Sequence, residues 1–65
     1  MGKRNRIIEV LREDWPLTIA EIAQRSSLTI EQVEHVIDNF EGHGQFQGIM
    51  RDDGKLSYKL NEHPY

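Results

Sequence analysis

The sequence predicts an α+β domain in which three helices are followed by a two-stranded β-hairpin. Three observations lead to this fold class. Apolar residues recur at helical spacing in three segments of the amino-terminal part of the chain. Two of these segments begin with the capping-box patterns TIAE and TIEQ. Farther along, Asp53-Gly54 separates two strand-like runs, which is a strong local signal for a hairpin.

The chain has 65 residues, a length that supports one small core. We therefore expect a single domain over 1–65, with its core at about 5–60 and a frayed tail at 61–65. It has no cysteine, which excludes a disulfide framework and a thiolate metal site. No apolar run approaches the roughly 18 to 20 residues that cross a bilayer. A cytoplasmic protein with no membrane partner is expected.

The first helix is expected at 5–14, where charged residues occupy one face and the other face holds Ile7, Ile8, Val10 and Leu11. Trp15-Pro16 ends this helix, because a proline ring disfavours helical geometry in the residue before it. We interpret Trp15 as a core residue, although an aromatic side chain here also suits a dimer or partner contact.

The second helix is expected at 19–25 and the third at 29–44, and a short connection between them makes a helix-turn-helix. Thr18 and Glu21 form the first capping box, and Thr29 and Gln32 form the second. The third helix is expected to stop at Gly44, with Gly42 as a second candidate. Its apolar face holds Ile30, Val33, Val36, Ile37 and Phe40.

The hairpin is expected to consist of QFQGIM and KLSYKL around RDDG. In the second run one face, Leu56, Tyr58 and Leu60, is expected to pack inward, and the alternate face, Lys55, Ser57 and Lys59, to contact water. In the first run Ile49 falls on the face opposite Phe46 and Met50 unless the chain bulges near Gly48, so its register stays open. The predicted core comprises Ile7, Ile8, Leu11, Ile22, Val33, Ile37, Phe40, Leu56 and Tyr58.

The stretch PLTIAEIAQRSSLTIEQVEHVIDNFEGHGQFQ, followed by DGKLSYKL, resembles the winged helix-turn-helix domains of bacterial and archaeal transcription regulators of the MarR, ArsR and Lrp kind. The resemblance covers about Ile7 to Leu60. It implies a small DNA-binding transcriptional regulator, with double-stranded DNA as its partner. A homodimer is one option, because one module covers a single half-site.

In that family the third helix enters the major groove and the wing contacts the backbone or the minor groove. The resemblance therefore places Gln32, His35 and Asn39 on the DNA-facing side. Gln32 and Asn39 suit paired hydrogen bonds to an adenine edge, and Thr29 at the helix start suits a phosphate contact.

Four acids on the same helix depart from the family pattern. Glu31, Glu34, Asp38 and Glu41 are spaced so that they lie within a band of about 80°, and the helix has no Lys or Arg. Such a stripe repels phosphates. Three interpretations of the stripe remain. It is a solvated face that favours solubility, or it is a docking surface for a basic protein without any DNA. The third is that single acids of the stripe bind cytosine amino groups.

The net charge of −3 and the pI of about 5.5 do not indicate a nucleic-acid partner by themselves. The cations gather near the two ends of the chain, however. If the fold brings these ends to the same side, phosphates are expected to contact Lys3, Arg4, Arg6, Arg51, Lys55 and Lys59, with Arg25 added from the second helix. The alternative is that these are ordinary solvated charges at termini and strand edges.

Other chemistry has little support in the sequence. His35 lies at helical spacing from Glu31 and Asp38, but without a second histidine or a cysteine nearby we expect a surface histidine and no metal. The sequence shows no catalytic triad and no glycine-rich phosphate loop, and a chain of this size leaves little room for a cavity of about 300 Å³. We expect neither catalysis nor a cofactor.

Overall fold

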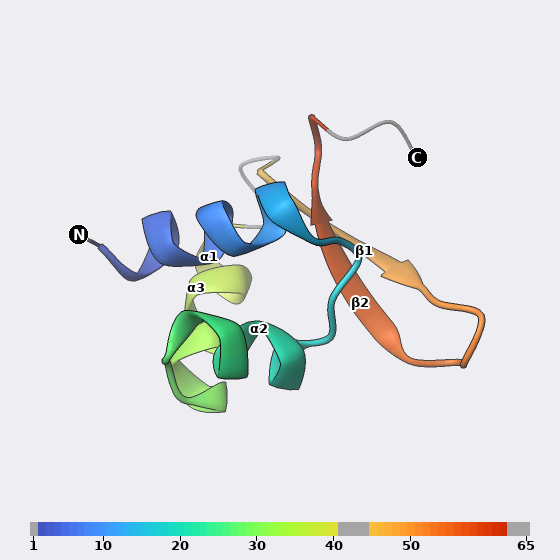
Figure 1. Cartoon of the computed structure of the whole chain (residues 1–65), viewed down its shortest axis with the longest axis horizontal. Helices are drawn as coiled ribbons and strands as arrows, with labels where there is room; N and C mark the ends of the chain where they lie inside the picture. The colour runs from blue at the N-terminus through green and yellow to red at the C-terminus, as the bar shows by residue number, and fades with distance from the viewer. Residues whose placement is uncertain (1, 41–44, 63–65) are drawn as a thin grey trace.

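The computed structural model describes residues 2–40 and 45–62 of the chain. Three helices, α1 (Lys3–Glu13), α2 (Ile19–Ser26) and α3 (Ile30–Phe40), precede two strands, β1 (Phe46–Met50) and β2 (Leu56–Leu60). The helices pack on one another and α1 also packs against β2, while the hairpin extends away from them (Figure 1). This is the predicted α+β winged helix-turn-helix architecture.

Both predicted capping boxes are present. At the start of α2, Thr18 Oγ1 accepts from the Glu21 N–H at 3.2 Å, and Glu21 Oε1 accepts from the Thr18 N–H at 2.8 Å. Thr29 and Gln32 make the same reciprocal pair before α3, at 3.1 and 3.0 Å. These bonds satisfy amides that a helix start leaves without an intrahelical acceptor, which is why the two helices begin at the predicted positions.

The other helix limits differ slightly from those expected. Helix α1 begins two residues earlier than predicted, directly after Gly2, and it has no side-chain cap. Helix α3 ends at Phe40, whereas the expected stops Gly42 and Gly44 lie outside the described residues. Asn61 and Glu62, where fraying was expected, make contacts: the Asn61 N–H donates to the Gln45 carbonyl, and Glu62 pairs with Arg12.

The wing has an uninterrupted antiparallel register that runs from Phe46↔Leu60 to Met50↔Leu56. It contains no bulge near Gly48, so Ile49 lies on the face opposite Phe46 and Met50. Gly54 has a φ of +83° in the turn, a conformation that glycine adopts without steric cost. The turn is closed by a hydrogen bond from the Arg51 N–H to the Lys55 carbonyl.

The chain before α2 contributes a third strand-like segment. The Leu17 N–H donates to the Tyr58 carbonyl at 3.1 Å, and the Tyr58 N–H donates to the Leu17 carbonyl at 2.8 Å. Strand β2 therefore has neighbours on both edges. Ser57 and Lys59, predicted to face water, are instead 0% and 2% exposed.

The core differs from the prediction at the wing. Leu56 is 51% exposed rather than buried, because the hairpin tip reaches beyond the helices. Ile8 is half-buried. Trp15 packs against the core, as predicted from the sequence. The side chain of Phe40 lies outside the described part of the structure. The buried apolar residues are Ile7, Leu11, Leu17, Ile22, Ala23, Val33, Val36, Ile37, Phe46, Tyr58 and Leu60.

Candidate nucleic-acid interface

The outer face of α3 is open to solvent along its length. Its inner face buries Val33, Val36 and Ile37 in the core. The opposite face exposes Glu31, Glu34, His35, Asp38 and Asn39, as the 3.6-residue periodicity requires. Ile30 was predicted to lie on the apolar face, but it is 50% exposed because it sits at the first turn, beyond the packed part of the helix.

The polar groups on this face are partly engaged with one another. Gln32 Oε1 accepts from the Thr29 N–H within the cap, so the paired adenine contact predicted for Gln32 competes with the start of α3. The Thr29 hydroxyl accepts from the Gln32 N–H and still has its own hydrogen to donate. Asn39 Nδ2 and His35 Nε2 lie 2.9 Å apart, one helical turn from each other.

The acids of α3 have no cationic partner within the described part of the chain. Glu31, Glu34 and Asp38 are exposed, and the described ion pairs involve other acids, namely Asp14, Glu21, Asp53 and Glu62. Glu41, the fourth member of the predicted stripe, lies outside the described residues. Within 2–40 and 45–62 the charges of Glu31, Glu34 and Asp38 are therefore not paired in salt bridges.

Lys3 joins this face from the other end of the sequence. It borders a surface hollow of about 530 Å³ together with Thr29, Glu31, Gln32 and His35. The first turn of α1 contains cations, no acid and no side-chain cap, so Lys3 adds to the positive end of that helix dipole. A cation is thus placed beside the start of α3, where a phosphate contact was expected.

The cations of the amino terminus and those of the wing are far apart along the molecule. The amino-terminal end of α1 and the hairpin turn lie at opposite ends of the longest axis (Figure 1), which measures 30 Å. Lys3, Arg4 and Arg6 are all exposed, as is Lys55 in the turn. The structure therefore holds two separate cationic regions.

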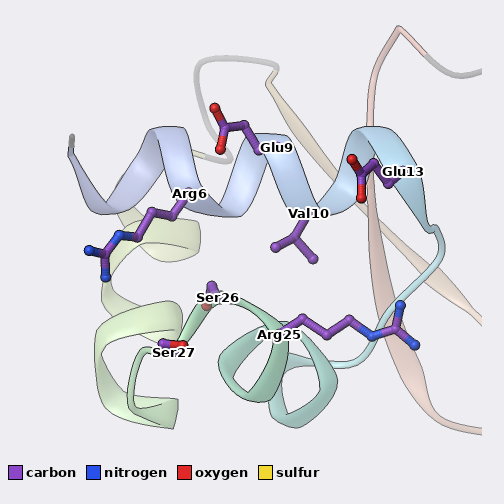
Figure 2. Close-up of a pocket in the computed structure, with 7 residues that line it drawn as sticks. All are labelled: Arg6, Glu9, Val10, Glu13, Arg25, Ser26 and Ser27. Atoms are coloured by element: carbon purple, nitrogen blue, oxygen red, sulfur yellow. The ribbon is translucent and has the colours of Figure 1, made fainter.

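Arg25 faces the groove between α1 and α2, a different surface from the exposed face of α3. Figure 2 shows Val10 pointing into this groove, with Arg6 and Arg25 extending toward its two ends. The hollow there is about 500 Å³ and opens onto the surface. Arg25 also forms an ion pair with Asp14. Its guanidinium therefore binds the carboxylate of Asp14, which directly follows α1.

Arg51 ties the wing to α2. Its Nη1 lies 2.8 Å from Glu21 Oε1, and its Nη2 lies 2.7 Å from Asp53 Oδ2. The hydrogen bond to Asp53, followed by the charges of Asp53 and Glu21, raises the pKa of Arg51. The hydrogen bond from the Thr18 amide and the charge of Arg51 lower the pKa of Glu21. Hydrogen bonds from the Arg51 side chain and the Lys55 amide lower the pKa of Asp53. Arg51 therefore has its charge neutralised within the fold.

Lys59 is the clearest correction to the predicted site. The whole residue is 2% exposed, so its ammonium is not presented to a phosphate. The physical reason is that both faces of β2 are covered, since residues 57–60 are all buried. Alternation along a strand predicts a wet face only where one side of the sheet is open to solvent.

Sequence reasoning also missed the two long-range associations that shape this surface. Lys3 meets the start of α3, and Arg51 meets Glu21, across 30 positions of the chain. No local pattern connects these residues, since both associations arise only when the helices pack. The capping-box motif at Thr18 did identify Glu21, but only for its role in the helix start.

The described residues contain neither a candidate metal site nor a membrane-spanning helix. Within 2–40 and 45–62, no three His, Asp or Glu side chains converge to hold a metal ion. Nor is any helix in these ranges long and apolar enough to cross a membrane.

The fold is shared with a solved structure. That structure, from Ralstonia eutropha JMP134 at 1.70 Å resolution, is described as a "putative DNA-binding protein". The TM-score is 0.75 at 21% sequence identity, and the alignment covers 92% of this chain and 82% of the other. At this identity the similarity concerns the fold. No protein-family model and no curated protein matches the sequence.

Proposed function

We propose that this chain is a winged-helix DNA-binding protein and a transcriptional regulator of the kind found among MarR, ArsR and Lrp proteins. The observation that carries the proposal is the position of Lys3 beside Thr29, Gln32 and His35 at the exposed start of α3. A cation suited to a phosphate and polar side chains suited to base edges are thus on one surface, which supports the proposal. The fold it shares with the Ralstonia protein is consistent with this role.

In the proposed complex α3 enters the major groove. The Thr29 hydroxyl donates to a phosphate while its oxygen keeps the cap, and the cations Lys3, Arg4 and Arg6 lie on the flanking backbone. Asn39 and His35, already adjacent, contact base edges together with the amide nitrogen of Gln32. Lys55 contacts the backbone from the wing. Arg25, Arg51 and Lys59 take no part, for the structural reasons given above.

The test is a titration of isotope-labelled protein with a mixed-sequence duplex at low and near-physiological salt. Amide shifts are expected in α3 and the wing turn, with an affinity that falls steeply with salt because phosphate binding releases counterions. Lys3→Ala and Lys55→Ala should each weaken binding and lower the slope of log K against log salt by about 0.9.

Arg12→Ala is the matched control. Arg12 is another exposed cation on α1, paired with Glu62 at 3.4 Å and outside the proposed interface. Its removal changes the net charge by the same amount and should leave the salt slope unchanged. Equal effects at Lys3 and Arg12 would show that only net charge matters. An absence of shifts at low salt would refute DNA binding altogether.

A second candidate function is supported by the unpaired acids of α3. Glu31, Glu34 and Asp38, with Glu41 of the same predicted stripe, would dock a basic protein surface and no DNA would be bound. The triple variant Glu31→Gln, Glu34→Gln and Asp38→Asn separates the two functions. It should raise DNA affinity by removing repulsion if DNA is the partner. If a protein is the partner, the variant should abolish α3 shifts that a lysine-rich peptide induces in the wild type.

We further propose that residues 1–65 act as a single cytoplasmic domain without catalytic activity or a cofactor. The support for a single domain is the small core shared by all five described elements, which leaves no separate second unit within the described ranges. Limited proteolysis should leave a fragment close to the full mass. Early release of the wing as a separate stable piece would contradict this single unit.

A further inference from the structure

Two side-chain amides lie on the outer face of α3, and their hydrogen bonds differ. Gln32 Oε1 accepts from the Thr29 N–H at 3.0 Å within the capping box. The carbonyl oxygen of this amide is therefore engaged, and its N–H groups remain for a partner. Asn39 Nδ2 lies 2.9 Å from His35 Nε2, and because an amide nitrogen can only donate, the histidine nitrogen accepts.

Asn39 keeps the groups that an adenine edge requires. One of its two N–H groups is donated to His35, which leaves the second N–H and the carbonyl oxygen. In the major groove adenine presents an acceptor, N7, beside a donor, the N6 amino group. Gln32, with its oxygen engaged, offers donors alone. Donors alone discriminate weakly, because every base pair has a purine N7 acceptor in the major groove.

The polar band of α3, which we define as Gln32, His35 and Asn39, is separate from the acids. At about 100° per residue these three side chains lie within about 60° of the helix surface, and the described acids of α3 lie within a neighbouring band of about 60°. Lys3 borders a hollow with Gln32 and His35, and Glu31 is the one acid of α3 at that hollow among the described residues. A duplex that approaches beside Lys3 therefore meets the polar band and leaves the other two described acids to one side.

We propose that Asn39 is the specificity-determining residue of α3 and binds an adenine in the major groove, with His35 as the residue that positions its amide. This inference rests on the proposed DNA binding. Asn39 Nδ2 donates to adenine N7 and Oδ1 accepts from the N6 amino group, while the hydrogen bond to His35 fixes which way the amide is turned. Adenine at this position is favoured over the other bases by roughly 5- to 150-fold.

The first measurement is the selection of binding sequences from a pool of random duplexes by the wild-type chain at pH 8. Affinities for the selected site and its single-base variants follow. One position should show the adenine preference, and Asn39→Ala should abolish the preference there while the other positions keep theirs. Binding without any adenine preference overturns this inference but leaves DNA binding intact. No enrichment and no binding of any duplex overturns both.

Asp38→Ala is the matched control. Asp38 is exposed beside Asn39 in the sequence but lies outside the polar band. Its truncation removes a negative charge, so it should raise the affinity for every duplex and leave the adenine preference unchanged. Loss of the preference in Asp38→Ala, or its persistence in Asn39→Ala, would contradict the assignment to Asn39.

The positioning role of His35 has its own readout, because protonation removes the acceptor at Nε2. Imidazole groups gain a proton between pH 8 and pH 5, and a protonated Nε2 donates, which turns the oxygen of the Asn39 amide toward it. The charged groups around His35 are Lys3 and the acids of α3, residue types that ordinarily keep their charge over this range. From pH 8 to pH 6 the adenine preference should fall while the affinity for all duplexes rises, since the new charge attracts phosphates.

Two variants of His35 complete the test. His35→Gln keeps an acceptor one helical turn from Asn39 but has no titrating proton, so its adenine preference should be the same at both pH values. His35→Ala removes the acceptor and should lower the preference at least about twofold at both pH values. Equal preferences in the wild type and both variants at both pH values would show that His35 does not position Asn39.

Discussion

At the scale of single residues, Arg51 connects three parts of the chain. Its guanidinium contacts Glu21 at the start of α2 and Asp53 in the wing turn, and it lies 3.5 Å from the Pro16 carbonyl. Arg51 was predicted to contact phosphate, but its side chain is 22% exposed and lies between two carboxylates. Glu21 in turn belongs to a capping box. The position of the wing and the start of α2 therefore depend on the same charges.

This network predicts a loss of stability in acid. The hydrogen bond from the Thr18 amide lowers the pKa of Glu21 in the folded protein, and the hydrogen bond from Arg51 lowers the pKa of Asp53. Groups with lowered pKa values stabilise the fold fully above their unfolded values, and this stabilisation is lost as the pH falls through the folded values. The free energy of unfolding should therefore decline as the pH drops below the ordinary pKa range of carboxyl groups, roughly 4.

Glu21→Gln isolates the contribution of one group. Glutamine also serves at this position of a capping box, so the helix start remains while the titrating charge is lost. Urea unfolding between pH 7 and pH 3 should show a shallower acid decline in this variant, whereas the exposed control Glu9→Gln should keep the wild-type decline. Identical slopes for all three proteins would exclude Glu21 as a source of the pH dependence.

At the scale of elements, the amino-terminal end of α1 lacks the usual stabilising groups. Gly2 provides no capping side chain, and the first turn contains Lys3, Arg4 and Arg6 but no acid. Cations at a helix amino terminus oppose the helix dipole. This arrangement lowers helix stability and is consistent with an anionic partner at this end, which is where the proposed phosphate contact lies.

Gly2→Asp should therefore stabilise the protein. Gly2 has extended geometry, with φ −73° and ψ 158°, and an added Cβ meets nothing within 4 Å. A capping carboxylate beside three cations should raise the free energy of unfolding by about 0.5 to 1 kcal/mol. Thermal unfolding checks this, with Gly2→Ala as control, because alanine adds a side chain without a cap. A gain no larger than that of Gly2→Ala would contradict the argument. The same aspartate should weaken DNA binding.

Local signals were sufficient for most elements. The threonines at 18 and 29 marked the starts of α2 and α3, because a capping box is a contact between residues three positions apart. The start of α1 was missed by two residues, since no cap marks it. The wing turn followed from Asp53-Gly54, but the register of the first strand was left open and came from the structure. The Leu17 segment beside β2 has no local signal of its own.

At the scale of the whole molecule, the hairpin extends past the helical layer, and this decides which wing residues belong to the core. Phe46, Tyr58 and Leu60 lie near the helices and are buried, whereas Met50 and Leu56 at the far end are exposed. Alternation along a strand assigns all five to one face. It does not determine how far along the strand the helices provide cover.

Ile37→Ala and Leu56→Ala test this limit of the core. Ile37 is fully buried, so its truncation should lower the free energy of unfolding by about 2 to 5 kcal/mol. That is a large part of the total for a chain of this size, which is of order 3 to 10 kcal/mol. Leu56 is half exposed and should cost less than about 1 kcal/mol. Urea unfolding of the two variants measures both values, and equal losses would mean that the wing tip is covered in solution.

The sequence by itself determined the order of the elements, the two capped helix starts, the face of α3 that packs and the hairpin turn. All of these depend on contacts between near neighbours and on periodicity. Only the tertiary structure decided that Lys59 is buried, that Arg51 pairs with Glu21 and that Lys3 lies beside α3. The physical reason is that charge and exposure depend on which distant segments pack together, and local sequence patterns contain no record of that packing.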